Sequence, residues 1–182
     1  IKWTLGNVAS LPYSDEYFNG AVCSLAIHHF TDLTSAFKEV YRVIDKGNFI
    51  IFTAFPDQMQ SYWLCNYFPE MMRRSIHNMP DQKTLVTSLQ SVGFEVKNIA
   101  PFFVTNELQD MFLYSGKERP EIYFDPNVRS NISSFASICN NVELDNGLSS
   151  LRADLSTGKF LSIKQKYPSL SGDYAYVVAR KN

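Results

Sequence analysis

The stretch GAVCSLAI at residues 20–27 is a nearly unbroken run of small and apolar side chains. A run of this kind is typical of a strand in a parallel sheet that helices cover on both faces. A second run, NFIIFTAF at residues 48–55, has the same character. The two runs therefore predict two buried strands in the middle of an α/β sheet.

An amphipathic helix is predicted between the two runs. Its apolar positions recur at helical spacing from Leu33 to Ile44, Asp32 stands at the N-cap, and Gly47 stands where a left-handed C-terminal residue is expected. A strand, helix and strand joined by short loops place the two strands parallel, with a right-handed crossing. The two runs are therefore predicted to be adjacent parallel strands, crossed on one face by a helix over residues 32–45.

The rest of the chain predicts further elements. Residues 1–5 alternate apolar and polar side chains, as a half-buried strand does, and because the chain opens at Ile1 within that pattern, a preceding segment is expected to have been removed. Residues 57–79 are rich in aromatic residues and methionine and predict one helix broken near Pro69. The remaining predicted elements are a helix over 81–91, a strand over 94–104, a helix over 142–154 and a last strand over 174–179.

Composition narrows the class of protein. With 182 residues, 45% of them hydrophobic, the chain fits one domain, residues 1–182. Seventeen basic residues against eighteen acidic ones form no block that could neutralise a row of phosphates, so no nucleic-acid partner is expected. Three widely spaced cysteines suit neither a disulfide framework nor a zinc site, which favours a cytoplasmic protein without a metal. No apolar run approaches the roughly 20 residues that span a bilayer, so no membrane partner is expected.

Four short motifs carry a resemblance to a known family. They are GNVASLP at 6–12, FN at 18–19, LAIHHF at 25–30, and EVYRVI followed by KG within 39–47. Their types and spacings resemble the class I S-adenosylmethionine-dependent methyltransferases that act on small molecules, whose usual pattern is G-D-A-x-x-L-P, F-D-x-V, L-H-H and E-x-x-R-V-L-K-P-G-G. The family's glycine-rich cofactor loop would precede Ile1.

The resemblance implies a fold. That fold is α/β: a Rossmann-like methyltransferase sheet with its N-terminal strands missing, a helical lid and an antiparallel last strand. The chain would be the C-terminal part of such a domain, with lid or insert helices at 57–79 and about 106–168.

The resemblance also implies a site for S-adenosyl-L-methionine. Adenine needs an acceptor for its amino group and a donor for its ring nitrogen. The implied acceptor is Asn7, where the family usually has aspartate, and the implied donor is the Val8 N–H. The cofactor site would also include Leu11, Ser24 and His29. Asn7 is alternatively a turn residue, and Ser24 alternatively a small core residue.

For catalysis, the residue implied is His28, as a general base, because neutral histidine can accept a proton from a hydroxyl or amine. The partner carboxylate of some sugar O-methyltransferases is replaced here by Ala54. The alternative is that both histidines shape the loop and cap the helix that begins at Asp32. Substrate-binding residues are predicted in the lid and beyond it: Tyr62, Trp63, Tyr67 and Arg129. The alternative is core packing for the aromatics and solvation for the arginine.

Three functions are compatible with these observations. The first is methyl transfer to a small-molecule acceptor, which a lid rich in tyrosine, tryptophan and methionine predicts to be apolar or aromatic. The second is a catalytically silent remnant that acts as a binding or partner subunit. The third is a dehydrogenase, for which the L-P and L-H-H motifs would be coincidence. The sequence leaves the oligomeric state and the choice among O-, N- and C-methylation open.

Overall fold

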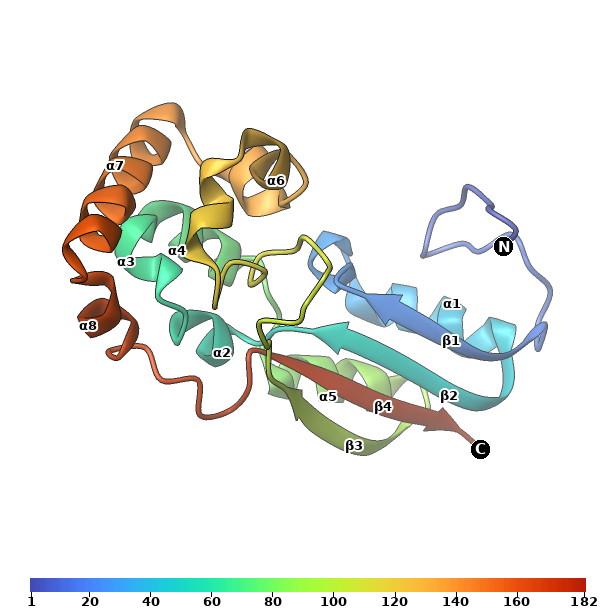
Figure 1. The fold of residues 1–182 in the computed structure, drawn as a ribbon. Coiled ribbons are helices and arrows are strands. Elements are labelled where there is room, and N and C mark those ends of the chain that lie inside the picture. Colours follow the sequence, from blue (N-terminus) through green and yellow to red (C-terminus); the bar gives the residue numbers. More distant parts are fainter. The chain divides into compact units, whose positions relative to one another are not determined.

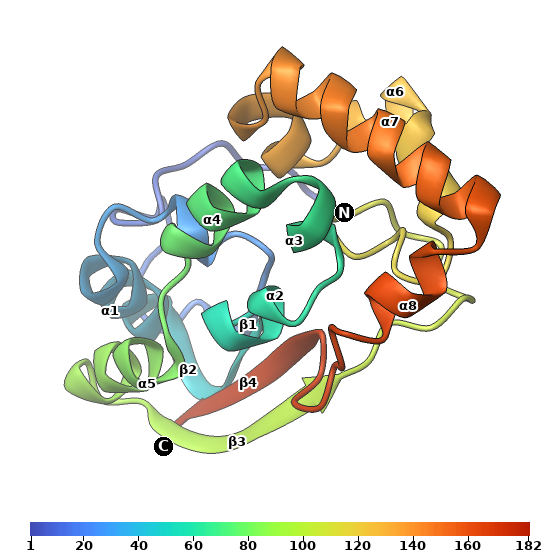
Figure 2. The ribbon, with the colours of Figure 1, turned by 90° about the vertical axis from the view of Figure 1, so that its left-hand side faces the viewer.

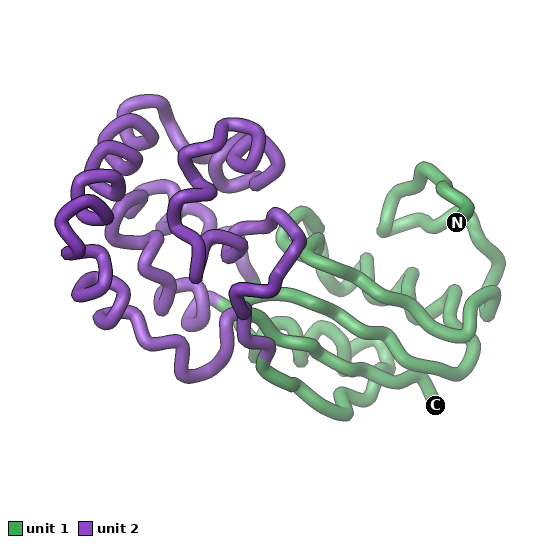
Figure 3. Tube along the Cα trace, viewed as in Figure 1, with its two compact units in different colours: residues 1–55, 80–101, 174–182 green, residues 56–79, 102–173 purple.

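A computed structural model describes all 182 residues, which divide into two compact units (Figure 3). Unit 1 comprises residues 1–55, 80–101 and 174–182, and unit 2 comprises residues 56–79 and 102–173. None of the helices is long and apolar enough to cross a membrane. The sequence predicts one domain with lid or insert helices at 57–79 and about 106–168. Because a lid is defined by its function, that assignment stays a prediction.

A four-stranded sheet forms the frame of unit 1 (Figure 1). Its strands lie in the order β1-β2-β4-β3, with bounds Phe18–Ser24 for β1, Ile44–Thr53 for β2, Glu95–Phe102 for β3 and Tyr174–Lys181 for β4. β1 and β2 are parallel, and β4 runs antiparallel to β2. Both the adjacent parallel pair and the antiparallel last strand are therefore as predicted.

Two helices, α1 (Leu33–Val43) and α5 (Gln82–Ser91), contact each other along one face of the sheet (Figure 2). Their N-caps are Asp32 and Asp81, whose carboxylates accept hydrogen bonds from the backbone N–H groups of Thr34 and Thr84. Apolar side chains of both helices form one core with the side chains that β2 and β4 direct to this face. The α1 crossing between β1 and β2 confirms the predicted strand, helix and strand.

The opposite face of the sheet is only partly covered. Val22 of β1 is 72% exposed and Tyr176 of β4 is 39% exposed, whereas Ala21 and Cys23 pack toward the core. The alternation arises because successive side chains of a strand point to opposite faces. The expectation that helices of this chain cover both faces is therefore wrong for β1.

Three local predictions need correction. Residues 1–5 form no strand and are exposed, because no strand of the chain pairs with them. The first buried strand ends at Ser24, since Leu25 adopts a φ of 50° that leaves the strand. Gly47 lies within β2 instead of capping α1: a Cβ there would lie 1.9 Å from the Asn19 carbonyl oxygen, so glycine permits the close approach of β1 and β2.

Unit 2 is helical. Its elements are α2 (Pro56–Gln60), α3 (Leu64–Tyr67), α4 (Pro69–His77), the 3₁₀ segment η2 (Pro120–Phe124), α6 (Pro126–Ser130), the π-helical turn η3 (Ser134–Ile138), α7 (Asn141–Thr157) and α8 (Phe160–Lys164). The predicted break at Pro69 is present, because the proline begins α4 at a position that needs no N–H donor. The prediction of one helix with a single break is wrong, since residues 61–63 also separate α2 from α3. The predicted helix over 142–154 lies within α7.

Candidate functional site

The candidate site begins where β1 and β2 end. Because these strands are parallel and Ser24 pairs with Phe52, their carboxyl ends lie side by side. Leu25 then turns with positive φ, and its N–H donates a 2.8 Å hydrogen bond to the Phe52 carbonyl oxygen. Open α/β sheets bind ligands at such carboxyl ends. Ser24 is exposed at this edge, and its hydroxyl makes no hydrogen bond.

His28 and His29 follow on the short 3₁₀ segment η1 (Ile27–His29), just before α1. Their ring centroids lie 4.0 Å apart, with His28 half-buried and His29 exposed. Burial lowers the pKa of His28 below 6.5, and the neighbouring charge of His29 lowers that pKa further. The structure therefore supplies a neutral imidazole at neutral pH, the form that can accept a proton.

No carboxylate accompanies this histidine. His28 makes no ion pair or hydrogen bond with an acidic side chain. β2 ends at Thr53 and Ala54 follows it, and both residues are buried. The Thr53 hydroxyl donates to the Ala54 carbonyl oxygen at 3.3 Å. An oriented base of the histidine–carboxylate kind is therefore absent. No group of three or more His, Cys, Asp or Glu side chains is placed to hold a metal ion.

The Asn7–Ser10 turn is exposed and internally bonded. The Asn7 Oδ1 accepts a 2.9 Å hydrogen bond from the Ala9 N–H, and the Asn7 carbonyl oxygen accepts one from the Ser10 N–H, also at 2.9 Å. An amide oxygen has two lone pairs, so Oδ1 can accept one more bond, and the Val8 N–H has no partner. A free acceptor beside a free donor fits the edge of an adenine ring.

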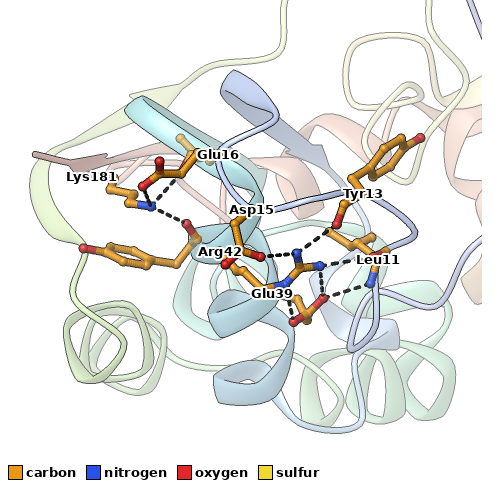
Figure 4. Close-up of polar contacts among 9 residues, drawn as sticks. Leu11, Tyr13, Asp15, Glu16, Glu39, Arg42 and Lys181 are labelled. Carbon is orange, nitrogen blue, oxygen red and sulfur yellow. Dashed lines mark hydrogen bonds and ion pairs between the residues drawn. The ribbon is translucent and has the colours of Figure 1, made fainter.

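Leu11, which follows this turn, is fixed by two charged residues of α1 (Figure 4). Its N–H donates to the Glu39 Oε2 at 3.0 Å, and its carbonyl oxygen accepts from the Arg42 Nη2 at 3.1 Å. Glu39 and Arg42 bind each other at 2.8 Å, and the Arg42 Nη1 also donates to the Tyr13 carbonyl oxygen and to the Asp15 carboxylate, each at 2.8 Å. We call this set, with Glu39 and Arg42 at its centre, the loop clamp.

The loop clamp was not predicted as part of the site from the sequence, where Glu39 and Arg42 served only as marks of the resemblance. The available signal was an acidic and a basic residue three positions apart on one helix face. Hydrogen bonds from Arg42, and then from the Leu11 N–H, lower the pKa of the Glu39 carboxyl, so it stays charged under mildly acidic conditions. The Leu11 side chain packs on the core of unit 1, so its backbone and its side chain are both engaged.

The predicted substrate-binding aromatic residues are buried in unit 2. The Tyr62 hydroxyl lies 2.5 Å from the Tyr123 hydroxyl, the Trp63 Nε1–H donates to the Lys117 carbonyl oxygen at 3.1 Å, and the Tyr67 hydroxyl donates to the Asp154 Oδ2 at 3.1 Å. All three side chains are at most 4% exposed.

Arg129 of α6 is held within the same unit. Its Nη1 donates to the Tyr123 carbonyl oxygen and so fixes the side chain against η2. The structure thus places Ser24, His28 and His29 together at one sheet edge, and the Asn7 turn on the loop that the clamp holds. Tyr62, Trp63, Tyr67 and Arg129 form part of a separately packed unit.

Comparison with known proteins identifies relatives. A family model described as a methyltransferase domain matches residues 1–52, which include the Asn7 turn, β1, both histidines and α1. A ubiquinone/menaquinone biosynthesis C-methyltransferase from Caulobacter sp. is 28% identical over 122 aligned residues, covering 56% of this chain and 48% of that protein. A mitochondrial 2-methoxy-6-polyprenyl-1,4-benzoquinol methylase from Dictyostelium discoideum is 28% identical, covering 52% of this chain and 37% of that protein. The chain thus spans at most about half the length of these relatives.

Solved structures agree with the sequence comparison. A structure described as a candidate methyltransferase of an antibiotic biosynthesis pathway, from Anabaena variabilis, matches with a TM-score of 0.87 at 29% identity, covering 100% of this chain and 73% of that one. The matched family region contains the parallel β1–α1–β2 arrangement and the histidine turn described above. The family model, the curated relatives and the solved structure make this chain similar to the class I S-adenosylmethionine-dependent methyltransferases.

Proposed function

We propose that the protein carrying this chain transfers a methyl group from S-adenosyl-L-methionine to a small-molecule acceptor. The observation that carries the proposal is the coincidence of the methyltransferase family match over residues 1–52 with the histidine turn at the carboxyl ends of β1 and β2. When bound, the cofactor supplies the electrophilic methyl group. The residues of this chain then bind, orient and, where needed, deprotonate.

Five residues are proposed to contact the cofactor. The Asn7 Oδ1 would accept a bond from the adenine amino group and the Val8 N–H would donate to a ring nitrogen, which the free lone pair and free N–H support. Leu11, whose side chain is only partly buried against the core, would present the exposed part of that side chain beside the adenine ring. Ser24 and His29, both exposed at the end of β1, would contact the amino-acid part.

His28 is proposed as the base. Its half-buried, neutral imidazole can take a proton from a hydroxyl or an amine as the methyl group is transferred, and the lowered pKa keeps it neutral at pH 7. Since no carboxylate orients the ring, its contribution should be largest for an acceptor that is already acidic, such as a phenol. A carbon nucleophile that is already electron-rich would need positioning alone.

Unit 2 is proposed to act as the lid and to supply the acceptor contacts. The acceptor class that fits best is apolar or aromatic. The aromatic and methionine content of residues 56–79 supports this class, as do the names of two relatives, which refer to ubiquinone or menaquinone biosynthesis and to a benzoquinol. Contact of the acceptor with Tyr62, Trp63, Tyr67 and Arg129 stays a prediction. Their polar atoms are bonded inside unit 2, so the aromatic residues would offer ring surface.

The test is transfer of a labelled methyl group from S-adenosyl-L-methionine to a panel of quinols, phenols and amines, with cofactor binding measured by calorimetry on the same protein. Labelled product is the expected result. Cofactor binding without transfer to any member, including substrates of the quinone-pathway relatives, would favour a binding role. Neither binding nor transfer would identify a catalytically silent remnant that acts as a partner subunit. The three free, widely spaced cysteines support a reducing compartment such as the cytoplasm as the location of the protein. The assay is therefore run under reducing conditions.

A further inference from the structure

The loop clamp fastens the N-terminal segment to α1 of unit 1. We propose that Glu39 and Arg42 are positioning residues: by fixing Leu11 and Tyr13, they hold the Asn7–Ser10 turn in the conformation that receives the cofactor. This inference rests on the proposed function. Neither side chain is required to touch the cofactor.

The geometry of Arg42 explains why this position suits arginine. Its Nε donates to the Glu39 Oε1 at 3.0 Å, while its two terminal nitrogens reach the Leu11 and Tyr13 carbonyl oxygens and the carboxylates of Glu39 and Asp15. A planar guanidinium presents five donors in a fixed fork, whereas a lysine ammonium is a single point charge. Only arginine can therefore hold these backbone and carboxylate acceptors at once.

Few other contacts fix the segment: the Leu11 side chain packs on the core, the Tyr13 ring meets the Phe18 ring, and the Glu16 N–H donates to the Arg42 carbonyl oxygen. Ile1, Trp3 and Leu5 are largely exposed, and the bonds inside the Asn7–Ser10 turn are exposed to water. The hydrogen bonds and ion pairs that tie residues 1–17 to the rest of unit 1 all involve Glu39, Arg42 or Lys181, and the Lys181–Glu16 pair is long at 3.8 Å. The fraction of molecules with an ordered turn should therefore depend on the clamp.

The clamp is also separated from the histidine turn along α1. Glu39 and Arg42 lie toward the end of this 11-residue helix, whereas His28 and His29 precede its N-cap, Asp32. A helix rises about 1.5 Å per residue, so about 10 Å or more of helix lies between the two groups. Loss of the clamp should thus impair cofactor binding and leave the environment of the histidine rings unchanged.

The experiment compares Arg42→Gln, Arg42→Lys and Asp81→Ala with the parent protein. Asp81→Ala is the matched control, because it removes the N-cap of α5 in the same unit and lowers stability without touching residues 1–17. Calorimetry well below the unfolding midpoints measures the Kd for S-adenosyl-L-methionine. Amide hydrogen exchange reports the order of residues 8–13, and NMR titration of His28 reports the histidine turn.

We expect Arg42→Gln to raise the Kd about tenfold, as it would if one molecule in ten kept the turn. Amide protection at Leu11 should fall and the His28 titration should stay unchanged, while Arg42→Lys should give a smaller rise. Asp81→Ala should lower the Tm and leave the Kd unchanged. Equal Kd values for the parent protein and Arg42→Gln would overturn the positioning role and leave the proposed function standing. If the parent protein shows no measurable binding of S-adenosyl-L-methionine, both the positioning role and the proposed function are overturned. If the Kd rises equally in Arg42→Gln and Asp81→Ala, the clamp contributes only to the general stability of unit 1.

Discussion

The side-chain oxygen of Asn7 accepts a 2.9 Å hydrogen bond from the backbone N–H of Ala9, which closes the turn on which the proposed adenine contact depends. The same atom thus has a local structural role and one lone pair left for a ligand. Removal of the side chain should affect both. Replacement by a carboxylate should preserve the turn and strengthen the acceptor, because hydrogen bonds to charged acceptors are roughly twice as strong as neutral ones.

Asn7→Ala is therefore expected to weaken S-adenosyl-L-methionine binding by about 1–2 kcal/mol, the usual cost of leaving a polar partner unpaired. Asn7→Asp should bind at least as tightly as the parent protein. Calorimetry on the three proteins measures both effects. Equal affinity in all three would assign Asn7 to the turn alone.

His28→Ala should lower kcat by about 10²-fold while the cofactor Kd holds, if His28 takes a proton from the acceptor. His77→Ala is the control, since His77 is exposed in the last turn of α4 within unit 2. Steady-state kinetics with the acceptor identified by the labelling panel measures the effect. A loss below about fivefold would leave His28 a structural residue and indicate an acceptor that needs no base.

The rate should also depend on pH in a defined direction. Burial, and then the charge of His29, lower the pKa of His28 below 6.5, so a rate that needs neutral His28 should fall only below that pH. The unfolded chain binds the proton more readily, so between the two pKa values the stability contribution of this group rises with pH and is lost as the solution is acidified. The pH profile of kcat and an NMR titration of His28 measure the two effects. An acid midpoint above 6.5 would contradict the assignment.

Asp173 forms the most enclosed ion pair of unit 2. Its side chain is 2% exposed, and its Oδ2 accepts from the Lys117 ammonium at 2.6 Å and from the Val104 N–H at 2.7 Å, while its Oδ1 accepts from the Ser169 hydroxyl at 2.7 Å. Asp173→Asn should therefore lower the free energy of unfolding by about 3 kcal/mol, since it leaves an enclosed lysine charge without its partner.

The matched control for Asp173→Asn is Glu70→Gln. Glu70 pairs with Arg73 at 2.6 Å, but both side chains are about half exposed or more, so its loss should cost under about 1 kcal/mol. Urea unfolding of both variants measures the difference. Equal losses would mean that burial does not distinguish the two pairs.

Local features of the fold were predictable from the sequence. The N-cap at Asp32, the helical spacing from Leu33 onward and the break at Pro69 are each encoded within a few residues, and the structure has all three. Buried apolar runs likewise located β1 and β2, although the true strand ends at Ser24 because of the positive φ at Leu25.

Long-range relationships were not predictable in the same way. The loop clamp joins Leu11 to Glu39 across 28 positions, and nothing near Leu11 announces its partner. Residues 1–5 alternate as a strand does, yet a strand needs a neighbour, and none in the chain pairs with them. The spacing of the aromatic side chains within 57–79 is compatible both with core packing and with a pocket lining. The structure shows that unit 2 buries Tyr62, Trp63 and Tyr67.

Gly47 gives a stability prediction that follows from its corrected position. A Cβ at this residue would lie 1.9 Å from the Asn19 carbonyl oxygen and 3.6 Å from the Gly20 Cα, all atoms of backbone that cannot rotate away. The pairing of β1 with β2 is irregular here, between Phe18 and Gly20, so the strands approach at this point without a regular register. Gly47→Ala should therefore force the two strands apart.

Ordinarily a Gly to Ala change with φ in the allowed range stabilises a protein by about 0.4–1 kcal/mol through the unfolded chain. Here the expected result is a loss of about 1–3 kcal/mol, the usual cost of overpacking, or more because the opposing atoms are backbone. Lys46→Ala is the control, since Lys46 is exposed in the same strand. Urea unfolding measures both free energies. Because the clash lies at the amino end of β1 and the histidine turn follows its carboxyl end, folded Gly47→Ala should retain the His28 titration. A stabilised Gly47→Ala would mean that β1 and β2 approach less closely than their backbone atoms indicate.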